Sequence, residues 1–409
     1  MRQRNRASHI KMLLGLGVLI AALSGCGSRE AVTATGAEET ASPANAAAGS
    51  VNILLRGDSA KIGGRGAEVE KGVLVIHEGG TYRLTGESRL PVEVRAANVS
   101  VTLIFAGEET NSIETDGREK KDGSAADPEG VDAAIFAKGN LTLRGSGSAN
   151  IKAANRGIVA KGELIVADGI FDLRTEDDIF CGKESVTLQG GAVRASAQGD
   201  KGKGVSSDGA VILSGGSYVF AHTSEGIEGK TIEMSGGSFD ISADDDGMNA
   251  REHYDKEKTK TKKKEANPEV RIHIAGGKLY VTAGGDGIDS NGDLIFSGGM
   301  SFVNGSDNGK DAALDWNGSC RVDGGVLIAS GMKARAEKIS PESAQPFFEW
   351  ELKSEHPQQE QISVQRSDGS TLYWELPRRA YDYVQISCPE LTEENTLHGV
   401  AGNESIALR

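Results

Sequence analysis

A short apolar triplet recurs along the middle of the chain, and its spacing constrains the fold more than any other feature. Triplets such as Leu141-Thr-Leu143 and Val211-Ile-Leu213 start at positions 141, 164, 186, 211, 232, 272 and 294, at intervals of 23, 22, 25, 21, 40 and 22 residues. The long interval contains the charged segment 251–267, and removing its 17 residues returns the interval to 23. Self-similarity at such a period is typical of stacked repeats, so 251–267 is expected to be a loop on a regular scaffold.

A glycine-containing corner follows each triplet from the second one onward. Glycine suits a tight turn with positive φ. After the corner comes a second alternating stretch, for example 238–241 or 278–281, whose apolar members can point into a common core. Each repeat therefore contains two or three short strands. The corners are Asp168-Gly169, Gly190-Gly191, Gly215-Gly216, Gly236-Gly237, Gly276-Gly277 and Gly298-Gly299, with Gly324-Gly325 marking one further repeat.

A third repeated element combines an acid, a glycine and an aliphatic residue. It occurs as Glu225-Gly226-Ile227, Asp246-Gly247-Met248 and Asp286-Gly287-Ile288, with Asp177-Asp178-Ile179 as a variant. No single repeat has enough apolar surface to fold alone, so neighbours must stack, which places equivalent residues about 4.8 Å apart. The sequence therefore predicts an all-β fold, a right-handed parallel β-helix (β-solenoid). A propeller needs longer repeats, and a leucine-rich repeat would show an asparagine ladder.

The regular body is expected to span residues 51–330. Upstream of the clearest repeats, 72–76, 81–84 and 99–104 are candidate strands of the first coils. Residues 331–409 lose the period, gain proline, tryptophan and tyrosine, and contain strand-like segments at 371–376 and 383–386. We expect this region to form a small C-terminal β cap over the open end of the stack.

The first residues are typical of a bacterial lipoprotein signal peptide, residues 1–25. A basic start runs into the apolar segment Met12 to Leu23, which is too short to span a bilayer stably. Leu23-Ser24-Gly25-Cys26 resembles the lipobox, in which the cysteine receives a diacylglycerol. An ordinary signal peptide is the alternative. Residues 26–50, rich in Ala, Thr, Glu, Ser and Gly, are expected to be a flexible tether, so the body would lie on the extracytoplasmic face of the cell membrane.

Composition excludes several classes of protein. The formal charge is −14, and it becomes −18 once residues 1–25 are removed, because they contain four basic residues and no acid. Nucleic acid is therefore excluded as a partner. Cys181, Cys320 and Cys388 are odd in number and have no paired spacing, so no disulfide framework or zinc site is expected. Aromatic residues make up only 5% of the chain, fewer than a conventional core uses, as a stacked core allows. We expect a monomer.

With these motifs, the chain resembles a bacterial carbohydrate-binding domain-containing family of parallel β-helix lipoproteins. The resemblance covers roughly residues 51 to 400, including the segment Val131 to Leu143, the repeats, and the segment Tyr383 to Leu391. It implies calcium and binding of acidic pectic polymers such as polygalacturonate. The chain departs from the family's pattern at two turns. At 155–158 an arginine replaces the acid, and the turn at 200–205 is longer than the others. Those two coils are expected to lack a cation.

The acidic turns are candidate calcium (Ca²⁺) ligands, because calcium prefers six to eight oxygens from carboxylates, amides, carbonyls and water. Stacked coils would bring these oxygens into one column, and crowded carboxylates without a cation would have raised pKa values. The alternative is that the aspartates bond their own turn backbone. The candidates are Asp244, Asp245, Asp246 and Asn249 on one turn, Asp286, Asp289 and Asn291 on the next, Glu225 and Glu228 one coil before, and Asp177 and Asp178 farther upstream.

Binding without catalysis is the function that the sequence favours. Many parallel β-helices degrade pectin with calcium and a basic residue, so a pectate-lyase-like enzyme is one alternative, and a structural surface protein is another. Apart from the lysines of the loop, the nearest basic residues to the acidic turns are Lys230, Arg251 and Lys310, which is few for a catalytic base. The loop 251–267 has seven Lys or Arg against four acids and either contacts a polyanionic sugar or is simply solvated.

The lipoprotein interpretation predicts that the mature protein partitions into detergent through Cys26. A diacylglyceryl group with an amide-linked chain anchors far more firmly than a single acyl chain. Cys26→Ser should release the protein into the aqueous phase of a detergent phase separation. A processed Cys26→Ser variant that stays with the membrane would contradict the interpretation.

Overall fold

The computed structural model describes residues 49–116, 132–252 and 266–408. The predictions for the signal peptide, for Cys26, for most of the tether and for most of the loop 251–267 lie outside these residues. The described chain is made of β-strands, with one 3-10 turn at Lys333–Arg335 and no α-helix. Within that part of the chain, no helix is long and apolar enough to cross a bilayer.

The repeated triplets form one parallel ladder, which we call the triplet ladder. Leu141 pairs with Leu164, Leu164 with Val186, and the pairing continues in the same register to Leu294. Ile232 pairs with Ile272 across the long interval, which confirms that segment 251–267 is inserted into an otherwise regular repeat. The strands are β10 (Asn140–Arg144), β13 (Glu163–Val166), β16 (Ser185–Leu188), β19 (Ala210–Leu213), β22 (Thr231–Met234), β25 (Arg271–Ile274), and the first parts of β28 (Asp293–Asn304) and β30 (Cys320–Gly331).

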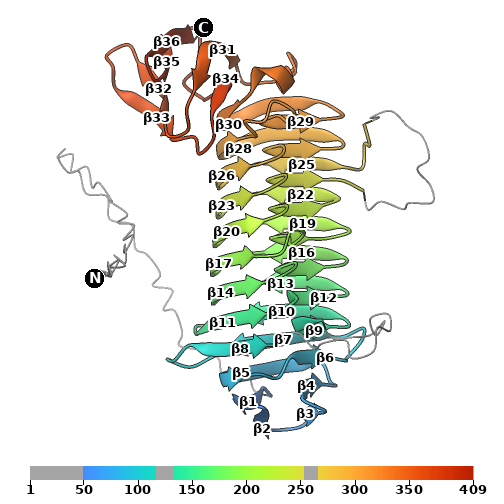
Figure 1. The fold of residues 1–409 in the computed structure, drawn as a ribbon. Coiled ribbons are helices and arrows are strands. Elements are labelled where there is room, and N and C mark those ends of the chain that lie inside the picture. Colours follow the sequence, from blue (N-terminus) through green and yellow to red (C-terminus); the bar gives the residue numbers. More distant parts are fainter. Residues whose placement is uncertain (1–48, 117–131, 253–265, 409) are drawn as a thin grey trace, which may run out of the picture. The chain divides into compact units, whose positions relative to one another are not determined.

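The stretches after the glycine corners form a second parallel ladder, the corner ladder. Each strand again pairs with the strand one repeat later, as in the pair Ser238 and Lys278. Figure 1 shows these strands stacked in sequence order. They are β8 (Asn111–Thr115), β11 (Ser148–Ala153), β14 (Ile170–Thr175), β17 (Ala192–Ala197), β20 (Ser217–Thr223), β23 (Ser238–Ala243), β26 (Lys278–Ala283) and the second parts of β28 and β30.

The acid-Gly-aliphatic elements lead into a third sheet of 11 strands. Its strands are short, and all pairs are parallel except β3 with β4. The strands are β3 (Ala67–Glu70), β4 (Val73–Ile76), β6 (Val92–Val94), β9 (Ala133–Ala137), β12 (Arg156–Ala160), β15 (Phe180–Gly182), β18 (Val205–Ser206), β21 (Ile227–Gly229), β24 (Met248–Ala250), β27 (Ile288–Ser290) and β29 (Leu314–Trp316).

The core lies between the three sheets and is built from equivalent residues of successive repeats. In the triplet Leu141-Thr142-Leu143 both leucines are fully buried and the threonine is not, and the same alternation recurs along the ladder. One apolar cluster runs from Ile53 to Ile339. The register is kept from Ser217 to Phe220 of β20, so like residues stack on like there: the Tyr218 and Phe239 rings lie 5.0 Å apart and nearly parallel. Such a core can therefore be filled with few aromatic residues. The three cysteines in the described residues are free thiols.

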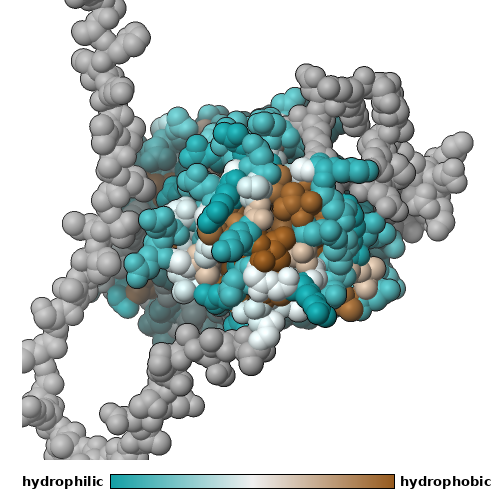
Figure 2. All heavy atoms as spheres, turned by 90° about the horizontal axis from the view of Figure 1, so that it is seen from below, coloured by the Kyte–Doolittle hydropathy of each residue, from teal (hydrophilic) through white to brown (hydrophobic). Residues whose placement is uncertain are grey.

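The first strands close the N-terminal end of the stack. β1 (Val51–Gly57) pairs parallel with β5 (Gly80–Ser88) and antiparallel with β2 (Ser59–Gly63), and β5 pairs in turn with β7 (Ser100–Phe105). The candidate strands at 72–76, 81–84 and 99–104 are thus β4, β5 and β7. Viewed from this end, the molecule shows a small hydrophobic patch ringed by hydrophilic residues (Figure 2). A small apolar patch of this kind is ordinary on the surface of a protein.

The C-terminal strands are antiparallel. β34 (Tyr381–Ser387) pairs with β30, the last parallel strand, and with β31 (Phe347–His356), so the edge of the corner ladder is occupied. A four-stranded sheet follows, and Trp350, Tyr381 and Ile386 are buried in a second core. Strands predicted at 371–376 and 383–386 are found at β33 and β34. The remaining strands are β32 (Ile362–Arg366), β33 (Thr371–Glu375), β35 (Leu397–Ala401) and β36 (Glu404–Leu408).

The glycine corners adopt the backbone conformation that the sequence predicted. The second glycine of each pair has φ between 75° and 88° from Gly191 to Gly325. A Cβ on Gly237 would lie 2.8 Å from the carbonyl oxygen of Gly215 in the coil before. Only glycine satisfies both the positive φ and the close approach of coils.

A matched pair of substitutions should separate the effect of positive φ from the effect of close coil packing. Gly237 and Gly369 have φ of 84° and 82°, but nothing lies within 4 Å of a Cβ on Gly369. Gly369→Ala should cost about 1–2 kcal/mol of unfolding free energy from conformation alone. Gly237→Ala should cost about 1–3 kcal/mol more, because the coils must move apart. Equal losses in denaturant titrations would contradict close coil packing at the corner.

Candidate functional site

The third sheet aligns two columns of polar side chains along its outer face. Ile227, Met248, Ile288 and Leu314 pair in succession and are buried. The residues that follow them therefore face outward in one column: Glu228, Asn249, Asp289 and Asp315. The turns before the strands stack as well, because Gly226 N–H donates to the Asp246 carbonyl and Gly247 N–H donates to that of Asp286, both at 3.0 Å. Glu225, Asp246 and Asp286 form this turn column.

Three carboxylates from the last turns meet at one place. Oxygens of Asp286, Asp289 and Asp315 all lie within 4.8 Å of one another, and we call these residues the carboxylate cluster. Asp286 also accepts a hydrogen bond from Ala312 N–H. In the preceding coil, Asp246 Oδ1 accepts from Asp286 N–H at 2.8 Å. Asp286 and Asp289, two of the ligands proposed from the sequence, lie on one turn, and the register places Asp315 of the next coil beside Asp289.

The turn column holds carboxyls with strongly raised pKa values. Burial raises the pKa of Asp246 to about 7, and the neighbouring carboxylates of Asp245, Asp289 and Asp311 add to the effect. Burial likewise raises the pKa of Asp286 to about 7, with repulsion from Asp246, Asp315 and Asp311. Near neutral pH these groups are therefore only partly ionised, whereas a bound cation would favour their charged forms.

Asn249 supplies an independent sign of a ligand beside these acids. The residue is only 6% exposed. Its Nδ2 donates to Asp246 Oδ2 at 3.1 Å, while its Oδ1 is buried with no hydrogen-bond partner among the residues that the structure describes. A buried amide oxygen without a donor is costly, and an amide oxygen is an ordinary calcium ligand. The donor set of carboxylates plus a carbonyl oxygen therefore fits a hard divalent cation.

One coil earlier, basic side chains lie against the acids. Lys203 Nζ is 2.6 Å from Glu228 Oε1 and 3.6 Å from Glu225 Oε2, and Arg251 contacts Glu228 as well. Burial raises the pKa of Glu225, and the adjacent Glu228 raises it further. Lys203 occupies the turn-column position between Asp178 and Glu225, since Gly204 N–H donates to the Glu225 carbonyl. Glu225 and Glu228 are thus compensated by protein cations.

The other predicted ligands lie apart from the carboxylate cluster. Asp244 and Asp245 are exposed in the turn before Asp246. Asn291 Oδ1 accepts from Asn317 Nδ2 at 2.7 Å. Asp178 accepts from Lys203 N–H and donates its own N–H to Asp177 Oδ1, which is the turn role that the alternative interpretation describes. The predicted residues therefore fall into separate groups on successive coils.

Two residues of these columns, Lys203 and Asp315, were not singled out from the sequence. Lys203 lies in the longer segment 200–205, where the 25-residue interval hides its alignment with Glu225. Asp315 follows Leu314 in a turn that reads Asp311-Ala312-Ala313, without the acid-Gly-aliphatic order. The signal that could have found Asp315 is its place one residue after an inward-facing aliphatic residue, which is where Asp289 also lies.

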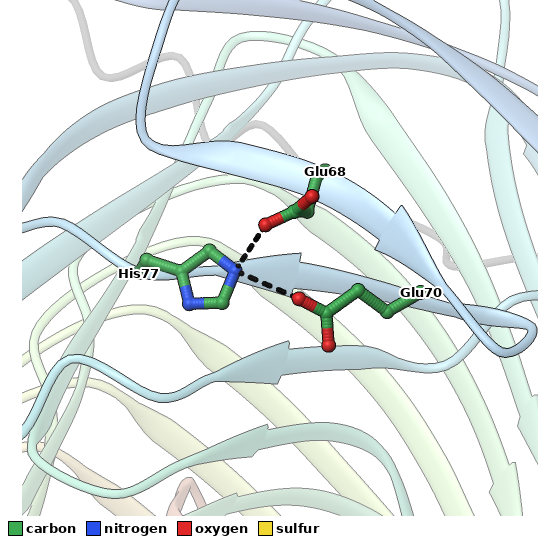
Figure 3. Close-up of side chains that lie close together, drawn as sticks. All are labelled: Glu68, Glu70 and His77. Atoms are coloured by element: carbon green, nitrogen blue, oxygen red, sulfur yellow. Dashed lines mark hydrogen bonds and ion pairs between the residues drawn. The ribbon is translucent and has the colours of Figure 1, made fainter.

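A second acidic group lies at the N-terminal end, and Figure 3 shows it. His77 Nε2 lies 2.9 Å from Glu68 Oε1 and 3.3 Å from Glu70 Oε1. Arg95 is 2.5 Å from Glu70 and 3.0 Å from Glu93, and its guanidinium holds the pKa of Glu70 below its usual range. Because Arg95 contacts Glu70 and Glu93, and His77 contacts Glu68, the group is a surface ion-pair network and carries no metal assignment.

The family of the chain follows from a match over more than half of its length. The model of a family described as "carbohydrate-binding domain-containing protein" matches residues 80–312. The chain belongs to that family. The matched range of this carbohydrate-binding domain includes Asp246, Asn249, Asp286 and Asp289 and ends just before Asp315.

Other comparisons add little to the family assignment. No curated protein matches the carbohydrate-binding domain-containing chain. A solved structure described as a polysaccharide lyase-like protein from C. thermocellum, in a gadolinium derivative, is 16% identical. That similarity covers 67% of this chain and 96% of the other, with a TM-score of 0.37, which is too low to carry detail across.

The ion pairs of Lys203 give a prediction about the stability of this carbohydrate-binding domain. Lys203→Met leaves the buried Glu225 and Glu228 with Arg251 as their one remaining ion-pair partner among the described residues, so unfolding free energy should fall by about 3 kcal/mol. Lys201, two residues away and exposed, provides the control Lys201→Met, which should change stability little. Denaturant titration of both variants measures the difference. Equal, small effects would mean that Lys203 does not compensate the buried acids.

Proposed function

We propose that the chain is a non-catalytic, calcium-dependent binder of an acidic, uronate-containing polysaccharide at the cell surface, built on a right-handed parallel β-helix. Membership of a carbohydrate-binding family supports the ligand class. The observation that carries the proposal is the buried Asn249 Oδ1, which has no hydrogen-bond partner in the described part of the chain and lies one strand from Asp289 of the carboxylate cluster.

The β-helix proposal is supported by the order in which the chain visits the sheets. Each repeat passes through the triplet ladder, the corner ladder and the third sheet, as β13, β14 and β15 do, and then returns to the triplet ladder at β16. Every strand pairs in parallel with its equivalent one repeat later. Parallel crossovers within a sheet are overwhelmingly right-handed, which gives the proposed handedness.

Calcium would be held by the carboxylate cluster and Asn249 Oδ1. Calcium takes six to eight oxygen ligands, so these protein groups leave positions for water or for uronate carboxylates of a glycan. The charge of the chain favours such bridging, because a protein with a formal charge of −14 repels a polyanion. Glu225 and Glu228 are left out of the proposed site, since Lys203 and Arg251 compensate them.

The calcium proposal predicts the behaviour of a double variant. Asp286→Asn with Asp289→Asn keeps the side-chain size but removes two charges, so calcium affinity should fall at least tenfold in titration calorimetry. Calcium should also raise the melting temperature of the wild type and not of the variant, because a ligand of the folded state stabilises it by mass action. Asp244→Asn with Asp245→Asn is the control, as both residues are exposed. Calcium affinity equal to that of the wild type in the Asp286/Asp289 variant would sink the site.

Catalysis is the alternative activity, and the proposal excludes it. A calcium-assisted lyase needs a free basic residue beside the cation. Lys203 and Arg251, the basic residues that contact the acids of the preceding coil, are engaged in ion pairs. Polygalacturonate incubated with protein and calcium should therefore give no unsaturated uronides, which absorb in the near ultraviolet. A calcium-dependent rise in that absorbance would make the protein an enzyme.

The proposed location is the extracytoplasmic face of the membrane, with Cys26 lipidated and residues 26–50 as the tether. A purely structural surface protein remains the third candidate. It differs by having no affinity for soluble polysaccharides. Polygalacturonate binding with calcium and its loss in chelator distinguish the two functions.

A further inference from the structure

A groove lies far along the stack, between the corner ladder and the C-terminal strands. One wall is formed by β26 and β28, and the other by β33 and the residues just after it. Its volume is about 460 Å³. The ladder wall lies within the family match at residues 80–312, whereas the C-terminal wall lies beyond it. The groove is on a different sheet from the carboxylate cluster.

Two aromatic side chains that line the groove are unusually exposed. Trp374 on β33 is 56% exposed, and Tyr280 on β26 is 39% exposed. Tyr280 is held in place by Phe302 of the next coil, since their rings stack 5.1 Å apart at 12°. Large aromatic side chains left open in a concave surface are typical of ligand sites. Their flat faces suit the C–H faces of pyranose rings.

The polar groups of the groove favour an uncharged ligand. Among the described residues that line it, the only basic side chain is Arg378. Arg378 donates two hydrogen bonds to Asp240, at 2.8 and 3.0 Å, so its charge is already matched. Thr282 and Gln359 also line the groove and offer neutral donors and acceptors for sugar hydroxyls. Among the described lining residues, no basic side chain is therefore left to pair with the carboxylate of a uronate.

The same face continues toward the N-terminal end as a second hollow of about 540 Å³. Its residues Asp172, Arg194 and Val219 are successive register partners, and the same column continues to Asp240, Tyr280 and Phe302. The two hollows therefore lie on one column of strands, spaced by about 4.8 Å per strand. An extended chain laid along the stack fits this layout.

We propose that this groove is a second glycan site, which binds a neutral pyranose chain by stacking on Trp374 and Tyr280, independently of calcium. The inference extends the proposed function, since both sites take polysaccharide. It does not depend on the calcium site. The ligand classes differ: uncharged sugar rings here, and carboxylated sugars at the carboxylate cluster.

The test uses the full mature protein and xylohexaose, a neutral oligosaccharide, in chelator. Calorimetry should detect binding, and tryptophan fluorescence should change on titration. Trp374→Ala should weaken binding at least tenfold, while Trp374→Phe keeps a ring and should retain most of it. Leu54→Ala, an exposed apolar residue on β1, is the control, and thermal melts verify folding.

The outcomes separate this proposal from the calcium site. Xylohexaose binding that is unchanged in the Asp286/Asp289 double variant and lost in Trp374→Ala supports it. No binding of xylohexaose by the wild type, or equal binding by Trp374→Ala, overturns it. Loss of calcium-dependent polygalacturonate binding in Trp374→Ala also overturns it, because the groove would then belong to the acidic site. Failure of polygalacturonate to bind at all would sink only the calcium proposal.

Discussion

In-register hydrogen bonding between equivalent residues of successive repeats is the constraint on which the structure depends. A strand such as β22 pairs with β19 on one side and β25 on the other, so every strand satisfies its backbone through its neighbours. A slip of one residue would turn the buried triplet residues toward solvent and the polar ones inward. The alternation along each strand therefore fixes the register, and the register fixes where every side chain lies.

The same constraint explains the electrostatics of the third sheet. Stacking about 4.8 Å apart forces equivalent acids into contact whether or not their charges are balanced. The charges of these acids are treated differently at different coils. At Glu225 and Glu228 the balance comes from Lys203 and Arg251. One and two coils later, Asp246 and Asp286 have raised pKa values, and the buried Oδ1 of Asn249, which bonds Asp246 through its Nδ2, has no donor among the described residues.

The sequence predicted the features that repeat and missed those that do not. Triplets, glycine corners and acidic turns each occur many times, so their alignment at Ile232 and Ile272 could be predicted across a long insertion. Lys203 and Asp315 lie where the period is irregular, and a periodic pattern carries no information about such positions. The groove at Trp374 and Tyr280 joins residues almost a hundred positions apart. Its existence depends on how the antiparallel strands dock on β30, which no local pattern encodes.

The most direct measurement of the central claim is an anomalous-scattering crystal structure of the mature protein grown with calcium. We expect an ion bonded to carboxylate oxygens of Asp286, Asp289 and Asp315 and to Asn249 Oδ1, with Lys203 still paired to Glu228. An ordered carboxylate cluster without an ion at saturating calcium, or an ion that displaces Lys203 at Glu225 and Glu228 instead, would contradict it.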